Sequence, residues 1–371
     1  EGAGVFKLAP PSGYLALCTA NLEEPTIGPN SLTQADDYFN TVIYSGNGTD
    51  DRGITGVGFK PDWVWLRSRA NADNNVLNDS SRGGNKQLFS NNVGAEGTAT
   101  NMLKTFNSDG FTLGTENAVN GSGRTYVSWN WKANGGTKTT NDASSTSVGT
   151  IDSVFQANTT SGFSIVTYTG TGSAGTIAHG LGAIPKWYFP KRRSNTGHWQ
   201  HYHAANTSAP ETDSIRFVAE ATVDFPYFND TAPTSTVFSL GDHVNVNASG
   251  ETYVAYCFAE VEGYSKFGSY SANANADGPF VYTGFRPAWL MIKGANNTQN
   301  WVMYDNTRRT FNGNDIELYA DLAAVEYDSG RDVDFLANGF KIRTVNYVNL
   351  SGGDYIYIAF AEAPFKYANA R

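Results

Sequence analysis

Three stretches of this 371-residue chain repeat one spacing of tyrosine, proline and tryptophan. In each stretch a proline follows a tyrosine by 17 residues and precedes a tryptophan by two. The tyrosines are Tyr44, Tyr168 and Tyr270, the prolines are Pro61, Pro185 and Pro287, and the tryptophans are Trp63, Trp187 and Trp289. A register kept without gaps indicates one structural unit that is present three times.

A second motif, Val-Asn-x-Ser-Gly, also occurs three times, further along each stretch. Its asparagines are Asn120, Asn247 and Asn349, and an aromatic residue follows each by 11 positions, namely Trp131, Phe258 and Phe360. The motif contains the Asn-x-Ser acceptor sequence for glycosylation. Because it recurs at one place in the repeat, we interpret these asparagines first as part of a shared turn.

Alternating apolar residues between Gly, Asn and Ser turns predict strands with one buried face, as in Phe163–Tyr168. One short helical stripe is expected within residues 315–327. Units of about 100 residues can each bury a core. The sequence therefore predicts an all-β fold of three tandem β-sandwich-like modules, rather than three blades of one ring.

The expected boundaries follow the repeat. We predict an extended N-terminal arm over residues 1–37 and β modules over 38–136, 161–262 and 263–371. Residues 137–160 are rich in Gly, Ser, Thr and Asn and offer little to bury, so a linker is expected there.

Charge and hydropathy exclude two classes of partner. The 26 Lys and Arg against 35 Asp and Glu give a net charge of −9, and no basic stripe suits nucleic acid. No run approaches the ~18 apolar residues of a membrane span. Cys18 and Cys257 lie in apolar contexts, which predicts two buried free thiols.

Three of the five histidines, His198, His201 and His203, lie within six residues. Imidazoles at this spacing could bind a metal. However, Asp79 and Asp305 occupy the place of His203 in the other units, without neighbouring histidines. We therefore favour a solvated, pH-sensitive patch on a loop.

Asn273, Asn275 and Asp277 resemble the opening of a calcium loop, but Gly284 stands where a bidentate Glu belongs. An Asx-rich turn is the simpler interpretation. The sequence Gly170–Gly175 matches a dinucleotide pattern, but the glycines and proline that follow would break the helix that such a site needs. We expect neither a metal nor another cofactor.

Asp79 and Arg82 recur as Asp305 and Arg308, while the middle unit has His203 at the first position. This pattern favours a turn-closing ion pair over a shared active site. The chain has no G-x-S-x-G elbow, no Cys/His nucleophile pairing and no repeated carboxylate pair. We expect a protein without enzymatic activity.

Aromatic side chains suggest a carbohydrate contact, because ring faces stack on sugars. The tryptophans that follow the repeated prolines are expected in cores. The surface candidates are Trp199 and Trp301, with their neighbours Tyr202 and Tyr304.

Several segments resemble a family of tailed-phage virion proteins. The similarity is carried by Gly284–Lys293, by Trp301–Arg308, by the C-terminal Tyr355–Arg371 and, in the first unit, by Gly58–Trp65. Phe6–Leu22 resembles the exit of a SPRY- or lectin-like sandwich that precedes these modules in longer members. The resemblance implies that the chain is a C-terminal portion and that its arm is a remnant of this sandwich.

What the resemblance implies is a fibre, spike or decoration protein on the virion surface, assembled as a homo-oligomer, with trimers usual by analogy. Its expected partners are its own copies, other virion proteins and a host surface glycan, bound by multivalent weak contacts. The family brings no catalytic residues. Two alternatives stay open, a glycan-degrading tailspike enzyme and a purely architectural filament or cement subunit.

Overall fold

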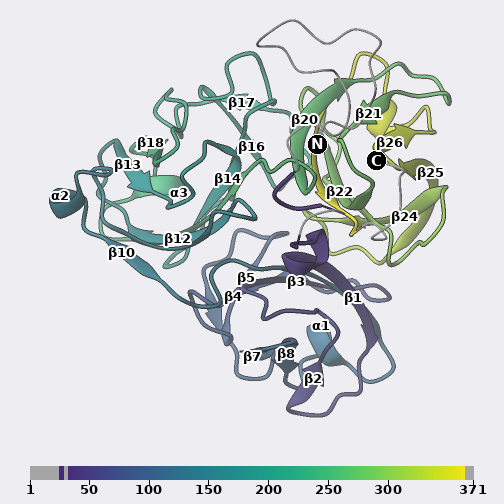
Figure 1. Cartoon of the computed structure of the whole chain (residues 1–371), viewed down its shortest axis with the longest axis horizontal. Coiled ribbons are helices and arrows are strands. Elements are labelled where there is room, and N and C mark those ends of the chain that lie inside the picture. The colour runs from purple at the N-terminus through teal and green to yellow at the C-terminus, as the bar shows by residue number, and fades with distance from the viewer. Residues whose placement is uncertain (1–24, 29–31, 364–371) are drawn as a thin grey trace, which may run out of the picture.

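The computed structural model describes residues 25–28 and 32–363. The described chain is nearly all β, as the sequence predicts, and its strands form three lobes around a common centre (Figure 1). We name the lobes the first (34–136), second (137–262) and third (263–363) segments. Most of the expected N-terminal arm, with Cys18, lies outside the described residues.

The first segment packs a six-stranded sheet, in the order β1-β9-β3-β4-β5-β6, on a smaller sheet, β2-β8-β7. Val64 and Leu66 of the large sheet and Phe111 of the small one share a core. The elements are η2 (Ala35–Asp37), β1 (Phe39–Ser45), β2 (Arg52–Ile54), β3 (Trp63–Ser68), β4 (Val76–Asp79), β5 (Lys86–Phe89), β6 (Gly97–Thr98), β7 (Leu103–Asn107), β8 (Gly110–Leu113), α1 (Asn117–Asn120) and β9 (Thr125–Trp131).

The second segment has an eight-stranded sheet, β10-β11-β12-β19-β14-β15-β16-β17, and a small sheet, β13-β18. Tyr188 of the large sheet and Phe238 of the small one share a core. The elements are β10 (Thr139–Asn141), α2 (Ala143–Thr146), β11 (Ser153–Asn158), β12 (Phe163–Thr169), β13 (Gly175–Ala178), β14 (Pro185–Arg192), β15 (Gln200–His203), β16 (Asp213–Arg216), β17 (Val223–Asp224), β18 (Val237–Leu240), α3 (Val244–Asn247) and β19 (Thr252–Ala259).

The third segment joins all its strands in one eight-stranded sheet, β20-β27-β22-β23-β24-β25-β26-β21. The elements are β20 (Ser265–Ser271), β21 (Phe280–Tyr282), β22 (Pro287–Gly294), β23 (Val302–Asp305), β24 (Asn314–Tyr319), β25 (Tyr327–Leu336), β26 (Gly339–Ile342), η3 (Tyr347–Asn349) and β27 (Asp354–Ala361).

The residues of the two repeated motifs meet on paired strands. Trp63 on β3 pairs with Trp131 on β9, and the corresponding pairs are Trp187 with Phe258 and Trp289 with Phe360. The strand after each asparagine motif therefore lies between the tyrosine strand and the proline-tryptophan strand of its own segment.

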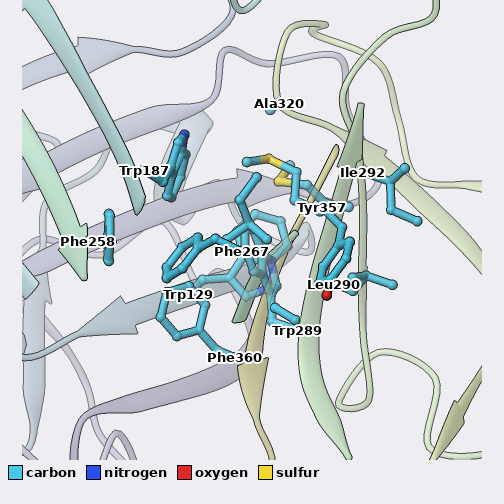
Figure 2. Packing of buried hydrophobic residues seen from close by; sticks show 14 of the residues in the cluster. Trp129, Trp187, Phe258, Phe267, Trp289, Leu290, Ile292, Ala320, Tyr357 and Phe360 are labelled. Carbon is cyan, nitrogen blue, oxygen red and sulfur yellow. The ribbon is translucent and has the colours of Figure 1, made fainter. Parts of the chain in front are cut away.

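The three segments share a further core beyond those within the first and second segments. Trp131, Phe258 and Phe360 lie against one another at the centre, with ring centroids 5.6 to 6.5 Å apart. Figure 2 shows Trp129, Trp187 and Trp289 from the three segments in the same cluster. The expectation of independent modules was wrong on this point, because each sheet also uses its second face to pack against the neighbouring segments.

Backbone hydrogen bonds close the three segments into a ring. The N–H of Glu96 donates to the carbonyl of Arg193, that of Thr222 to Ala295, and that of Glu326 to Arg69, at 2.7 to 2.8 Å. Each segment thus donates to a different neighbour. We call the three contact zones the first–second, second–third and first–third seams.

Two sequence predictions fail for local reasons. The expected linker 137–160 contains β10, α2 and β11, which extend the sheet of the second segment. Ile151 in this stretch joins the core of the second segment, and its polar residues form hydrogen bonds, as when the fully buried Gln156 donates to Ser80 and Ser81. In place of the expected helix within 315–327, β24 runs to Tyr319 and an irregular segment leads to β25, because pairing with β23 and β25 satisfies the backbone of β24.

Candidate functional site

The tryptophans expected at the surface are buried in the seams. Trp199 and Trp301 are 1% and 0% exposed, so the expectation that they are exposed was wrong. The indole of Trp199 donates to the carbonyl of Phe89 at 2.9 Å, and that of Trp301 to Arg216 at 2.7 Å. In the first segment the amide of Asn75 makes the corresponding bond to Tyr319 at 2.8 Å.

Tyr202 and Tyr304 are buried as well. Tyr202 stacks on Tyr188, with centroids 4.8 Å apart, and Tyr304 donates its hydroxyl to Glu317 at 2.8 Å. None of the four aromatic candidates offers a free ring face to a sugar. The sequence of one repeat does not show that another segment covers its aromatic side chains. The sequence alone therefore could not indicate that these four side chains are buried.

His201 and His203 belong to a seam and not to a solvated patch. Both side chains are fully buried, and burial lowers the pKa of His203 to about 4. The backbone N–H of Ala205 donates to Nδ1 of His203, so Nε2 carries the hydrogen and donates to the carbonyl of Tyr357 across the second–third seam, both at 3.2 Å. The neutral imidazole therefore fits its surroundings. Protonation at Nδ1 would place a second N–H against the N–H of Ala205. His198 is half-buried.

The candidate calcium loop uses its oxygens within the protein. Asn273 Oδ1 accepts from Asn275 and Asn349, and Asp277 pairs with Lys341 at 2.8 Å. Among the residues that the structure describes, no group of three or more His, Cys, Asp and Glu side chains is placed to hold a metal ion.

The repeated asparagines hold equivalent turns. Asn247 is fully buried; its Oδ1 accepts from Thr171, and its Nδ2 donates to Ser173 and Gly241 at 2.7 and 3.0 Å. Asn120 and Asn349 make the matching bonds in the other segments. These buried side chains are structural in the folded chain, and a glycan cannot be attached to them without opening the turn.

The repeated acid and base pairs connect neighbouring segments. Asp79 and Arg82 are fully buried together, and Asp79 also accepts the hydroxyl hydrogen of Tyr256 at 2.7 Å. Asp305 pairs in the same way with Arg308 and accepts from the indole of Trp129 at 3.1 Å. Both pairs close a turn, as expected, and in addition they bridge a seam.

One pair of exposed aromatic rings was not found by sequence reasoning. Phe280 and Tyr282 on β21 are 46% and 64% exposed, and Val281 between them is buried. The sequence contains the alternation Phe-Val-Tyr, which is typical of a strand. Alternation alone does not show which face of the strand is buried.

A cavity of about 240 Å³ lies between the first and third segments. Asp36, Phe39 and Glu362 are among the residues that line it. Partial burial, followed by the charge of Asp37, raises the pKa of Asp36, while Glu362 pairs with Arg286. A carboxyl group with a raised pKa and an ion-paired carboxylate therefore line one cavity.

No helix in the described part of the chain is long and apolar enough to cross a membrane. Neither curated proteins nor solved structures gave a match to this chain. A family model described as a domain of unknown function, DUF7483, matches residues 34–364 and thus most of the chain, including all three segments. The chain therefore belongs to the DUF7483 family.

Proposed function

We propose that the protein is a structural component of a tailed-phage virion, displayed on the particle surface as a tail fibre, spike or decoration protein. Its role is in assembly and in adhesion to the host surface or its glycans. The proposal is supported by the resemblance of Gly58–Trp65 and Gly284–Lys293 to virion proteins. In the structure these two sequence stretches include the start of β3 and most of β22, and both strands contribute to the shared core.

The proposal rests mainly on one observation: buried charged groups form contacts between the segments. The ammonium group of Lys191 donates to the carbonyls of Val93, Gly94 and Gly197 at 2.8 to 3.1 Å, and so joins the second segment to the first. The buried Asp79–Arg82 pair likewise bridges a seam. Groups that could serve catalysis instead hold the ring together, which suits a rigid display scaffold.

The proposed partners are further copies of the chain, with a trimer as the expected state, and other virion proteins. Neither nucleic acid nor a membrane is a proposed partner. Light scattering on the purified chain of 40.1 kDa should give the mass of three copies. A mass of one copy at all concentrations would contradict the trimer.

The test of the virion role is direct. Particles of the phage that encodes this chain are purified on a density gradient, and the protein is sought by mass spectrometry and by immunogold labelling. A phage replication protein serves as the negative control. Copies on the particle surface support the proposal, while absence from particles that contain the other structural proteins overturns it.

The cavity with Asp36 and Glu362 favours one second candidate, a glycan-degrading tailspike enzyme. Glycoside cleavage uses two carboxyl groups in different environments. Asp36 has a raised pKa, and Glu362 is paired with Arg286. Incubation with host polysaccharide should then release reducing ends, and Asp36→Asn should abolish the release. Unchanged polysaccharide after incubation with the wild type contradicts this candidate.

A further inference from the structure

The outer face of β21 carries two exposed aromatic rings side by side. Because alternate side chains of a strand share a face, Phe280 and Tyr282 point to the same side, about 7 Å apart along the strand. β21 is an edge strand of its sheet and pairs with β26. The rings therefore lie at a margin that a long ligand can reach.

The neighbouring strand leaves these rings uncovered. Gly339 on β26 pairs with Tyr282 in the ladder. A Cβ atom at Gly339 would lie 2.1 Å from the carbonyl oxygen of Val281 and 3.1 Å from Cε2 of Phe280. A side chain at this position would displace the strand and crowd the Phe280 ring, so the glycine leaves room for that ring.

Charged side chains beside the rings are paired with one another. Lys341, opposite Phe280 in the ladder, contacts Asp277 at 2.8 Å, and Arg343 contacts Asp334 at 2.6 Å. Each cation thus has a carboxylate partner, and the rim that these four side chains form carries no net charge. Such a rim does not attract a polyanion, but it offers hydrogen-bonding groups next to an apolar surface.

Ile54 on β2 and Ile177 on β13 match the buried Val281, because each of the three pairs with a phenylalanine of the neighbouring strand. The positions that match Phe280 and Tyr282 carry no aromatic ring: they are Gly53 and Thr55 in the first segment and Thr176 and Ala178 in the second. The exposed aromatic pair is therefore particular to the third segment and is not part of the repeated framework. A feature that the shared fold does not require points to a separate role.

We propose that Phe280 and Tyr282 form a binding platform for an uncharged polysaccharide. A pyranose ring has an apolar C–H face that stacks on an aromatic ring and hydroxyl groups at its edge for a polar rim. Two rings at this spacing contact neighbouring sugars of one chain. The inference rests on the proposed adhesive function and names its ligand class and contact residues.

Affinity electrophoresis of the full chain tests this platform, with gels that contain a neutral glucan, mannan or galactan. Wild type should be retarded by at least one of them. The double variant Phe280→Ala with Tyr282→Ala should bind about tenfold more weakly or not at all. Tyr282→Phe, which keeps the ring, should retain binding.

The matched control is Phe311→Ala, because Phe311 is 61% exposed in the same segment but lies outside β21. It should bind as wild type does. Circular dichroism establishes that each variant is folded, and if the double variant is not, the two single variants replace it.

Three results overturn the platform. They are equal retardation of the double variant and wild type, binding of wild type to heparin or oligothymidine but to no neutral polysaccharide, and failure of wild type to bind any polysaccharide. The virion role is measured separately on particles, so a protein that is present on particles but binds no glycan disproves the platform alone.

Discussion

The indole of Trp131 lies edge-on to the ring of Phe360, with centroids 5.6 Å apart and an interplanar angle of 71°. Phe258 contacts both rings, at 6.5 and 5.7 Å. The residue that follows each repeated asparagine by 11 positions thus meets its two equivalents. One central aromatic contact thus joins the three segments through a shared core.

The shared core predicts that the whole ring unfolds together. Phe258→Ala should reduce the free energy of unfolding by about 4 kcal/mol, because the ring is 1% exposed and its removal leaves a cavity between segments. Urea unfolding followed by tryptophan fluorescence and by circular dichroism should give one coincident transition. The exposed Phe311→Ala should have little effect. Separate transitions for the three segments would contradict the shared core.

The turn asparagines should be sensitive to substitution. Asn247→Ala removes the acceptor of the Thr171 N–H and the donor to the Gly241 carbonyl, and leaves the Ser173 carbonyl with only the Thr171 hydroxyl. We expect a loss of about 3 kcal/mol in urea unfolding, because buried polar groups without hydrogen bonds are costly. Asn195→Ala, at an exposed position, is the control. A difference between the two variants below about 0.5 kcal/mol would disprove the structural role.

The first–second seam depends on an ionised carboxylate. Partial burial by itself would raise the pKa of Glu96, but hydrogen bonds and charges from Arg193 and Arg82 outweigh it and lower the pKa. A lowered carboxylate pKa gives stability that is present above the ordinary value of 4.5 and is lost as the pH falls through the folded pKa. Glu96→Gln should therefore cost about 2 kcal/mol at neutral pH and progressively less in acid. The exposed Glu262→Gln should leave stability unchanged at every pH.

The second–third seam should weaken in acid. The pKa of His203 is lowered from 6.5 to about 4 by burial, so the unfolded chain binds more protons than the folded chain between these values. Stability should fall as the pH drops from 6.5 to 4, by about 3 kcal/mol from this residue. His203→Asn should flatten the profile of unfolding free energy against pH. His198→Asn, at a half-buried position, should flatten it less, and equal profiles for His203→Asn and wild type would exclude the effect.

Local chemistry was readable from the sequence where the cause was local. Strand alternation predicted the all-β class, and the recurrence of Asp79 and Arg82 predicted a turn-closing pair that the structure contains. The carbohydrate candidates failed because exposure is not a local property. Trp199 looks like a loop aromatic beside polar neighbours, yet its indole reaches the carbonyl of Phe89 in another segment.

The amino-acid sequence by itself determined the β character of the chain and its repeated turns, because side-chain alternation and Asn, Gly and Pro act over a few residues. The tertiary structure alone decided that the segments close into a ring, which places Trp131, Phe258 and Phe360 at one centre and leaves Phe280 and Tyr282 outside. The physical reason is that every sheet has two faces. One face is covered within its segment, and only long-range packing decides what covers the other.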